Sequence, residues 1–138
     1  MTTMTDCIFC KIIRGEVPSP VIYEDDETFA FLSNGPDNPG HTLVIPKDHL
    51  ENVYEMDEKH YGPMMQTVKK MAVAVKRGMN ADGINVHMNN DGPAGQVVFH
   101  AHIHIIPRFI GDGLKHWPNG KYKEGEEEIV AKKIKAAL

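Results

Sequence analysis

Three histidines, His100, His102 and His104, stand at alternate positions in an apolar run over residues 97–106. Side chains of a strand alternate between its faces, so this spacing predicts three imidazoles on one side, with neighbours about 6.6 Å apart along the backbone. Packing alone does not justify the desolvation of three ionisable rings, so the row indicates chemistry. Imidazole near neutral pH serves as nucleophile, hydrogen-bond donor or cation, and a row of three suits an extended anion such as phosphate better than one metal ion. The opposite face is expected to enter the core through Phe99, Ala101, Ile103 and Ile105.

Four further strands are expected to position this row. Residues 21–24 and 28–32 read as a hairpin across an acidic turn, and residues 42–45 form a third strand that ends at Pro46. Residues 84–88 form the fourth strand, and its short connection to the histidine run makes these two strands antiparallel neighbours. The sequence therefore predicts an α+β fold with an antiparallel five-stranded meander sheet.

Helical periodicity predicts one main helix over residues 57–77 and a short closing helix in the tail after residue 125. Glutamates precede lysines in the tail segment, which complements a helix dipole. One helix on one sheet leaves apolar surface to cover, so we expect a homodimer. The expected core positions are Tyr61, Met65, Val68, Met71 or Ala72 and Val75 in the main helix, and the apolar face of the tail helix carries Val130, Ile134 and Ala137.

Length and composition favour a single domain. The chain has 138 residues, no repeat, and a formal net charge of -4, so it offers no basic face for a nucleic-acid duplex. No apolar run is longer than residues 71–75, far short of a membrane span. Two cysteines three positions apart are too few for a secreted disulfide framework. We therefore expect a cytoplasmic protein that does not bind membranes.

The run His100-Ala101-His102-Ile103-His104-Ile105-Ile106 resembles the histidine triad (HIT) motif of a family of nucleotide hydrolases and transferases. Segments around Cys7-Ile8-Phe9-Cys10, Gly40-His41-Thr42-Leu43-Val44-Ile45-Pro46-Lys47, Asn89 and Gly95-Gln96 also resemble bacterial members. The resemblance covers about residues 7–108 and implies a HIT-like fold, with residues 109–138 as a C-terminal tail of the same domain.

The resemblance implies cleavage of the bond between the α-phosphorus of a purine nucleoside monophosphate and a leaving group. His102 is then the nucleophile that forms a nucleotidyl-histidine, and His104 and His41 act on the phosphoryl group. Donating imidazoles stabilise the developing charge, so no magnesium is required in principle. The favoured substrates are AMP- or GMP-type phosphoramidates. Dinucleoside polyphosphates, a nucleotide-binding scaffold with weak catalysis, and a hydrolase that uses a catalytic metal remain alternatives.

Nucleotide contacts are carried over by position. Asn89, Gly95 and Gln96 match residues of the loop that approaches the phosphate, where Asn and Gln side chains bind it or fix an imidazole. The chain departs from its relatives at Val97, where many have Ser or Thr, and at Ser33 with Asn34, where an acidic or amide residue usually holds the ribose. Four apolar residues stand where relatives form the wall of a base-binding pocket, and packing in the core is an equally good explanation of them. They are Ile8, Phe9, Phe31 and Leu32.

The pair Cys7 and Cys10 leaves three readings open from the residues alone: a redox pair, part of a metal site, or two buried small side chains. Redox is the weakest of these, because only six residues precede Cys7 and leave no room for the preceding strand. The resemblance adds His49 and His100 as partners and implies a structural zinc site with four ligands. Trp117, in a Gly- and Pro-rich stretch, would close over the leaving group or pack at a dimer seam.

Overall fold

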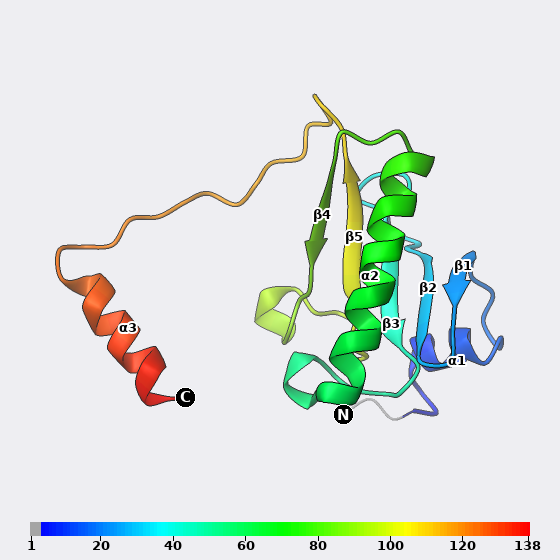
Figure 1. The fold of residues 1–138 in the computed structure, drawn as a ribbon, viewed down its shortest axis with the longest axis horizontal. Coiled ribbons are helices and arrows are strands. Elements are labelled where there is room, and N and C mark those ends of the chain that lie inside the picture. The colour runs from blue at the N-terminus through cyan, green and yellow to red at the C-terminus, as the bar shows by residue number, and fades with distance from the viewer. Residues whose placement is uncertain (1–3) are drawn as a thin grey trace.

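The computed structural model describes residues 4–138 and centres on one antiparallel sheet of five strands in the order β1-β2-β3-β5-β4 (Figure 1). Its strands are β1 Val21–Glu24, β2 Thr28–Leu32, β3 Thr42–Pro46, β4 Gly83–His87 and β5 Ile103–Arg108. Three α-helices, α1 Ile8–Ile13, α2 Glu58–Gly78 and α3 Glu126–Ala136, accompany two short 3-10 turns, η1 Val53–Glu55 and η2 Gly92–Ala94. The predicted fold class, an α+β domain with a five-stranded antiparallel sheet and one main helix, is confirmed.

The predicted meander is wrong for the last two strands, because β5 and not β4 lies next to β3. After β3 the chain crosses the sheet through α2, whose 21 residues span about 30 Å, and continues as β4 at the outer edge. The following strand, β5, then returns into the gap between β3 and β4. This arrangement places the histidine run in the interior of the sheet, with a paired strand on each side.

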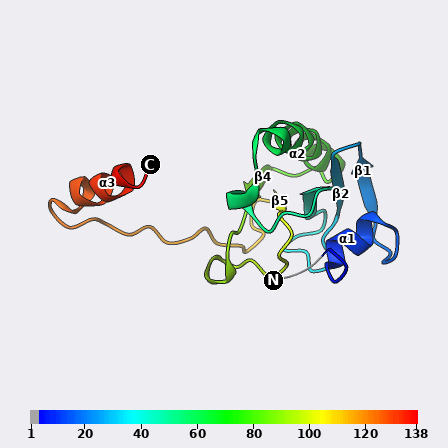
Figure 2. The ribbon, with the colours of Figure 1, turned by 90° about the horizontal axis from the view of Figure 1, so that it is seen from below.

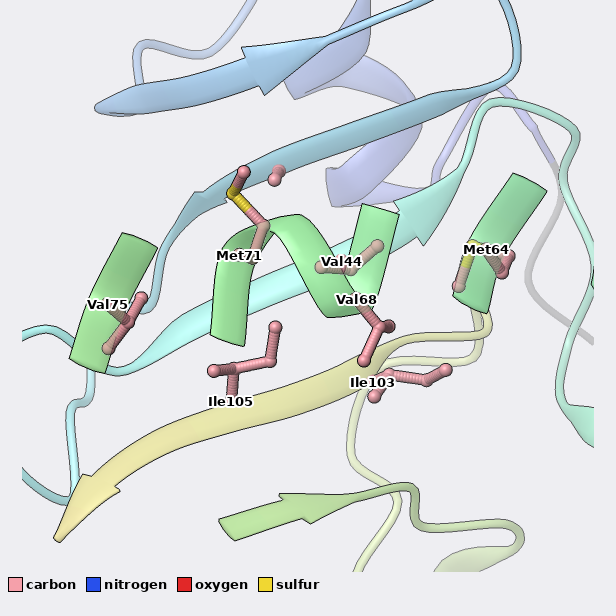
Figure 3. Packing of buried hydrophobic residues seen from close by; sticks show 8 residues of the cluster. Val44, Met64, Val68, Met71, Val75, Ile103 and Ile105 are labelled. Carbon is pink, nitrogen blue, oxygen red and sulfur yellow. The ribbon is translucent and has the colours of Figure 1, made fainter. Parts of the chain in front are cut away.

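Helix α2 covers one face of the sheet and packs a stripe of apolar side chains against Val44, Ile103 and Ile105 (Figure 3). Two predicted core residues are wrong, because Tyr61 is 49% and Met65 is 54% exposed. In the first half of α2, the buried face is shifted by one position from the predicted one. It includes polar residues that have hydrogen-bond partners, and a search for apolar residues alone does not find them. Its buried members are His60, Met64, Thr67, Val68, Met71 and Val75.

Hydrogen bonds at the helix start explain this register. Asp57 caps α2, and its side chain and that of His60 form a capping box with each other's backbone. The His60 ring also lies 3.1 Å from the Asp48 carboxylate, and the Thr67 hydroxyl lies 2.7 Å from that of Thr28. These partners satisfy the polar groups that α2 buries.

Strand β5 is shorter than predicted, because it begins at Ile103 rather than at residue 97. Its ladder with β3 starts at the pair Val44 and Ile103. Farther along β3 stands Pro46, which has no N–H to donate to another strand. Only His104 of the three histidines therefore lies in the strand, and His100 and His102 precede it, although Ala101, Ile103 and Ile105 are buried as expected.

Helix α1 packs on the opposite face of the sheet from α2, at the β1–β2 end (Figure 2). Its residues Phe9 and Cys10 are buried with Phe29, Phe31 and Leu43 in a second apolar cluster. Helix α1 does not extend over β5 and β4, so that half of the face is left without a helix (Figure 2). This half of the sheet contains His87 on β4 and His104 on β5, which are paired in the strand register.

Residues 113–123 form an extended arm that carries α3 away from the sheet, and the tail helix therefore does not close the domain as predicted (Figures 1 and 2). No residue of α3 is buried. The helix itself was predicted correctly, but no surface within residues 4–138 covers its apolar side. Among residues 4–138, no helix combines the length and apolar character needed to cross a membrane.

Candidate active site and metal-binding cluster

Four side chains from distant parts of the chain converge at the end of β3. Cys7 and Cys10 belong to the start of α1, His49 follows β3, and His100 precedes β5. One ligand atom from each lies within 4.8 Å of all the others. The separations from His100 Nδ1 are 3.4 Å to Cys7 Sγ, 3.5 Å to Cys10 Sγ and 3.3 Å to His49 Nδ1, and Cys10 Sγ lies 3.4 Å from His49 Nδ1.

These distances fit a tetrahedral metal ion. Bonds of about 2.0–2.1 Å to nitrogen and 2.3 Å to sulfur place tetrahedral ligands about 3.4 Å apart for two nitrogens and about 3.6 Å apart for nitrogen and sulfur. The four separations given above lie within about 0.2 Å of these values, and the other two pairs of ligand atoms, Cys7 with Cys10 and Cys7 with His49, lie within 4.8 Å. Two thiols and two imidazoles without a water position are the donor set of a closed site, and this cluster could therefore hold a metal ion.

A backbone hydrogen bond and burial set the protonation states of this cluster. His100 donates from Nε2 to the Pro46 carbonyl at 2.8 Å, which leaves the lone pair on Nδ1, the atom that faces the sulfurs. Burial lowers the pKa of His100 to about 4, so the ring is neutral at pH 7. Burial raises the pKa of the Cys10 thiol to about 11, and a bound cation would supply the charge that deprotonates it.

His102 presents one ring nitrogen as a lone pair. Its Nδ1 lies 2.7 Å from the His100 carbonyl, which can only accept, so Nδ1 carries the hydrogen and Nε2 is free of it. The edge-to-face contact of Phe9 with this ring, 5.2 Å between centroids, holds its orientation. Burial lowers the pKa of His102, which keeps Nε2 unprotonated and nucleophilic.

His104 presents the opposite form, a donor. The Asp37 N–H donates to His41 Nδ1 at 3.1 Å, so the hydrogen of the neutral His41 ring is on Nε2. That hydrogen points to His104 Nδ1 at 2.9 Å, which places the hydrogen of the neutral His104 ring on Nε2. His104 Nε2 is buried and has no hydrogen-bond partner in the described chain. An unpaired buried donor costs about 1–3 kcal/mol, which a ligand oxygen or leaving group would recover.

Position 40 makes this arrangement of His41 possible. Gly40 has φ +98°, a left-handed conformation that side chains rarely adopt, and a Cβ there would lie 2.6 Å from Met79 Cγ. The strand that follows Gly40 is β3, which pairs with β5. His41 is 4% exposed and reaches His104 across this pair.

Acid should destabilise the fold through these rings. Burial, followed by the neighbouring His102, His87 and His41, lowers the pKa of His104 to about 3. Between about 6.5, the ordinary pKa of histidine, and about 3, the unfolded chain binds a proton on this residue that the folded chain does not, so the free energy of unfolding falls as pH falls. Thermal melts across this range should show a shallower pH dependence for His104→Asn than for the wild type. A matched change at the exposed His116 should keep the wild-type slope, and equal slopes for all three proteins would contradict the assignment.

Sequence reasoning missed His87. It lies on β4 directly opposite His104, and the two rings stack with centroids 4.6 Å apart and planes 18° from parallel. The strand register, which places residues 87 and 104 side by side, is the signal that could have found it. A hollow of about 510 Å³ begins beyond His87, although no histidine of the triad lines it. Its wall is formed by Asp37, Asn85, Val86, His87, Ile106, Arg108, Leu114, Lys115, His116 and Trp117.

The loop before the triad is fixed by Gln96. Its amide oxygen accepts from the Asp91 N–H at 2.8 Å, and its nitrogen donates to the Glu51 carbonyl at 2.6 Å and the Val98 carbonyl at 3.1 Å. Gln96 thus holds the loop, and its direct contact with a nucleotide stays a prediction. The Asn89 side chain lies against Gly95, where a Cβ would come within 3.4 Å of its amide nitrogen.

The other residues predicted to contact the nucleotide differ in how far they are buried. Phe9 and Phe31 are core residues in contact with each other, as one of the two readings had it. Ile8 is 41% exposed and Val97 is 84% exposed, whereas Leu32 is half-buried. The half-buried Ser33 accepts a hydrogen bond from the Gly35 N–H, and Asn34 beside it is exposed. A role of these residues in binding stays a prediction.

Comparison with known proteins decides the family. Residues 14–111 match the HIT domain family. The chain belongs to the HIT family. It is 46% identical over 131 residues to an uncharacterized HIT-like protein of Methanocaldococcus jannaschii, a match that covers 94% of this chain and 98% of that protein. A solved structure from Streptococcus mutans is 38% identical, with a TM-score of 0.91 over 98% of this chain and 87% of the other.

Two relatives in the HIT family have names that state an activity. Adenosine 5'-monophosphoramidase of Candida albicans is 38% identical over 112 residues, which cover 78% of this chain and 74% of that protein. Adenylylsulfatase of Arabidopsis thaliana is 43% identical over 113 residues, which cover 82% of this chain but 57% of the longer relative. A zinc-bound histidine triad protein of Mycobacterium smegmatis is 32% identical, with a TM-score of 0.77 over 99% of this chain and 100% of the other. Hydrolysis of nucleotides is the activity that these relatives indicate.

Proposed function

We propose that this HIT protein hydrolyses purine nucleoside phosphoramidates through a nucleotidyl intermediate on His102. The observation that carries the proposal is the pair of opposed tautomers, a lone pair on His102 Nε2 beside a buried, unpaired donor on His104 Nε2. The two rings meet edge to face with centroids 4.9 Å apart. A nucleophile and a proton donor at that separation suit the two ends of a breaking bond to phosphorus.

In the first step, His102 Nε2 donates its lone pair to the α-phosphorus. The bond from phosphorus to the leaving nitrogen breaks, and that nitrogen keeps the electron pair and takes the proton of His104 Nε2. Water then attacks the phosphorus and gives a proton back to His104, the P–N bond to His102 breaks, and AMP or GMP leaves. His41 supports both steps, because its Nε2–H fixes His104 Nδ1 as the acceptor. Magnesium is not required for these steps.

The cluster of Cys7, Cys10, His49 and His100 would hold a structural zinc ion. The ion would act as a cross-link, because its four ligands belong to α1, the segment after β3 and the segment before β5. His100 lies two residues before the nucleophile, so a fixed His100 also fixes the carbonyl that sets the His102 tautomer. The zinc-bound relative supports the choice of metal.

We place the protein in the cytoplasm as a homodimer. Reduced cysteines suit a reducing compartment, and the exposed Tyr61 and Met65 leave apolar surface on α2 for a second copy to cover. Nucleotide contacts are assigned to the loop that contains Asn89, Gly95 and Gln96, with Ser33 and Asn34 toward the ribose.

A comparison of two substrates tests the proposed activity. Release of AMP from adenosine 5'-phosphoramidate should be at least about tenfold faster, as kcat/KM, than from diadenosine tetraphosphate, because a protonated nitrogen leaves readily once His104 has supplied the proton. The opposite ranking would establish the polyphosphate hydrolase in its place. Binding of AMP without turnover of either substrate would leave a nucleotide-binding scaffold.

A further inference from the structure

His87 presents the flat face of its ring to His104. The two residues are directly opposite each other on β4 and β5, and their rings stack with centroids 4.6 Å apart and planes 18° from parallel. Ile84 and Met88 pack into the core under α2, so alternation along the chain puts His87 on the opposite face of the sheet. His104 lies on this same face, and strand pairing therefore fixes the contact between the two rings.

Each neighbour of His104 restrains a different part of its ring. His41 contacts one atom, since its Nε2 lies 2.9 Å from His104 Nδ1. His102 meets the ring edge to face, with planes 61° apart. His104 Nε2 has no hydrogen-bond partner within residues 4–138 and adds no restraint of its own. A single hydrogen bond lets a ring tilt about the bonded atom, whereas a stacked ring opposes the tilt, so His87 is the neighbour that fixes the plane of His104.

Stability of the strand does not account for a histidine at position 87. The residue is half-buried in a strand, where β-branched and large aromatic side chains fit better. A further ionisable ring beside buried histidines instead adds a cost of desolvation. Burial is the main cause that lowers the pKa of His104, and His87 is one of the neighbours that lower it further. Both effects of His87, on the plane of the ring and on its charge, favour His104 as a neutral donor.

We propose that His87 is a positioning residue, which holds the ring plane of His104 so that the Nε2 hydrogen points to the leaving group. This role rests on the proposed function, in which His104 protonates the leaving nitrogen. Only Nε2 can supply that hydrogen, because Nδ1 accepts from His41. A tilt of the ring turns Nε2 away from the breaking bond, and small displacements of a catalytic group slow a reaction strongly. Loss of the stack should therefore slow the reaction and leave nucleotide binding intact.

Two replacements of His87 test the stack. His87→Val keeps a side chain that suits a strand but removes the flat face, whereas His87→Phe keeps a ring. With adenosine 5'-phosphoramidate, His87→Val should lower kcat by about tenfold or more with KM within about twofold, and His87→Phe should recover most of this loss. His116→Val is the matched control, because it exchanges an exposed histidine of the arm, and it should keep the wild-type kcat.

A second substrate separates positioning from a general loss of structure. The p-nitrophenyl ester of AMP releases a phenolate that departs without a proton, so His87→Val should hydrolyse it within about twofold of the wild-type rate. Equal slowing of both substrates by His87→Val would overturn the proposal. A wild-type rate of this variant on the phosphoramidate would do the same.

Nitrogen NMR of the His104 ring tests the positioning without turnover. In protein with isotope-labelled histidines, the His104 signals can be assigned by their loss in His104→Asn, and at neutral pH they should show a hydrogen on Nε2 and none on Nδ1. His87→Val should move both signals towards the average of the two tautomers, and His87→Phe should not. If the wild type hydrolyses neither substrate, the proposed function fails, and this spectrum still decides the role of His87. Identical His104 signals in the wild type and His87→Val would show that His87 does not position the ring.

Discussion

Replacement of His102 by alanine should lower kcat by roughly 10³-fold or more, because no other group can form the covalent intermediate. Affinity for AMP should remain measurable, since the phosphate loop and His104 are untouched. The measurements are single-turnover release of AMP from adenosine 5'-phosphoramidate and a titration with AMP. His102 packs against Phe9, so a thermal melt of the variant must accompany the kinetics.

The matched control is His116→Ala, which removes an exposed imidazole from the arm. It should turn over within about twofold of the wild type. If His102→Ala kept even a tenth of the wild-type rate, His102 would not be the nucleophile.

Replacement of Cys10 by alanine should remove the bound zinc and lower the melting temperature by more than about 10 °C. Binding energy of a structural metal is folding energy, and values near 10 kcal/mol are usual for four-ligand sites. The ligands here tie three separate segments together, so the loss should affect the whole domain. Metal analysis of protein purified without chelator, together with thermal melts, measures both effects.

His87→Asn is the control for this variant, because it changes a half-buried histidine outside the cluster and should keep about one zinc per chain. A measurement of much less than one zinc per chain in the wild-type protein would contradict the zinc site. Unchanged stability of Cys10→Ala would show that the cluster is two thiols packed beside two imidazoles.

Much of the fold follows from patterns that are local in the sequence. The hairpin of β1 and β2 was predicted from its acidic turn, and the structure explains it, because Asp25 Oδ1 accepts from the N–H groups of Glu27 and Thr28. Turn chemistry of this kind acts over a few residues. The length of β5 could not be predicted in this way, because its ladder with β3 begins at the pair Val44 and Ile103, two residues that are far apart in the chain.

The main helix shows a second limit. Val68, Met71 and Val75 are buried as predicted, whereas Tyr61 and Met65 are exposed. In their place the helix buries Met64 and the polar His60 and Thr67, which have partners in Asp48 and Thr28. Such partners lie on other elements, so periodicity alone does not identify them.

The sequence predicted which residues form the site better than it predicted their geometry. The resemblance grouped Cys7, Cys10, His49 and His100, and the structure brings them together. The tautomers of His102 and His104 depend on backbone groups whose positions no residue type reveals. His87 was missed for the same reason, since only the strand register places it on His104.

The most direct test of His102 as the nucleophile is to identify the residue that carries the nucleotide during turnover. Wild-type protein mixed with adenosine 5'-phosphoramidate, quenched within one turnover and digested, should yield one adenylylated peptide, with the modification on His102 by mass spectrometry. Attachment should be lost on mild acid treatment, as expected of a phosphoramidate bond, and His102→Ala should show none. An adenylyl group on any other residue, or release of AMP without any adduct on the protein, would contradict the mechanism.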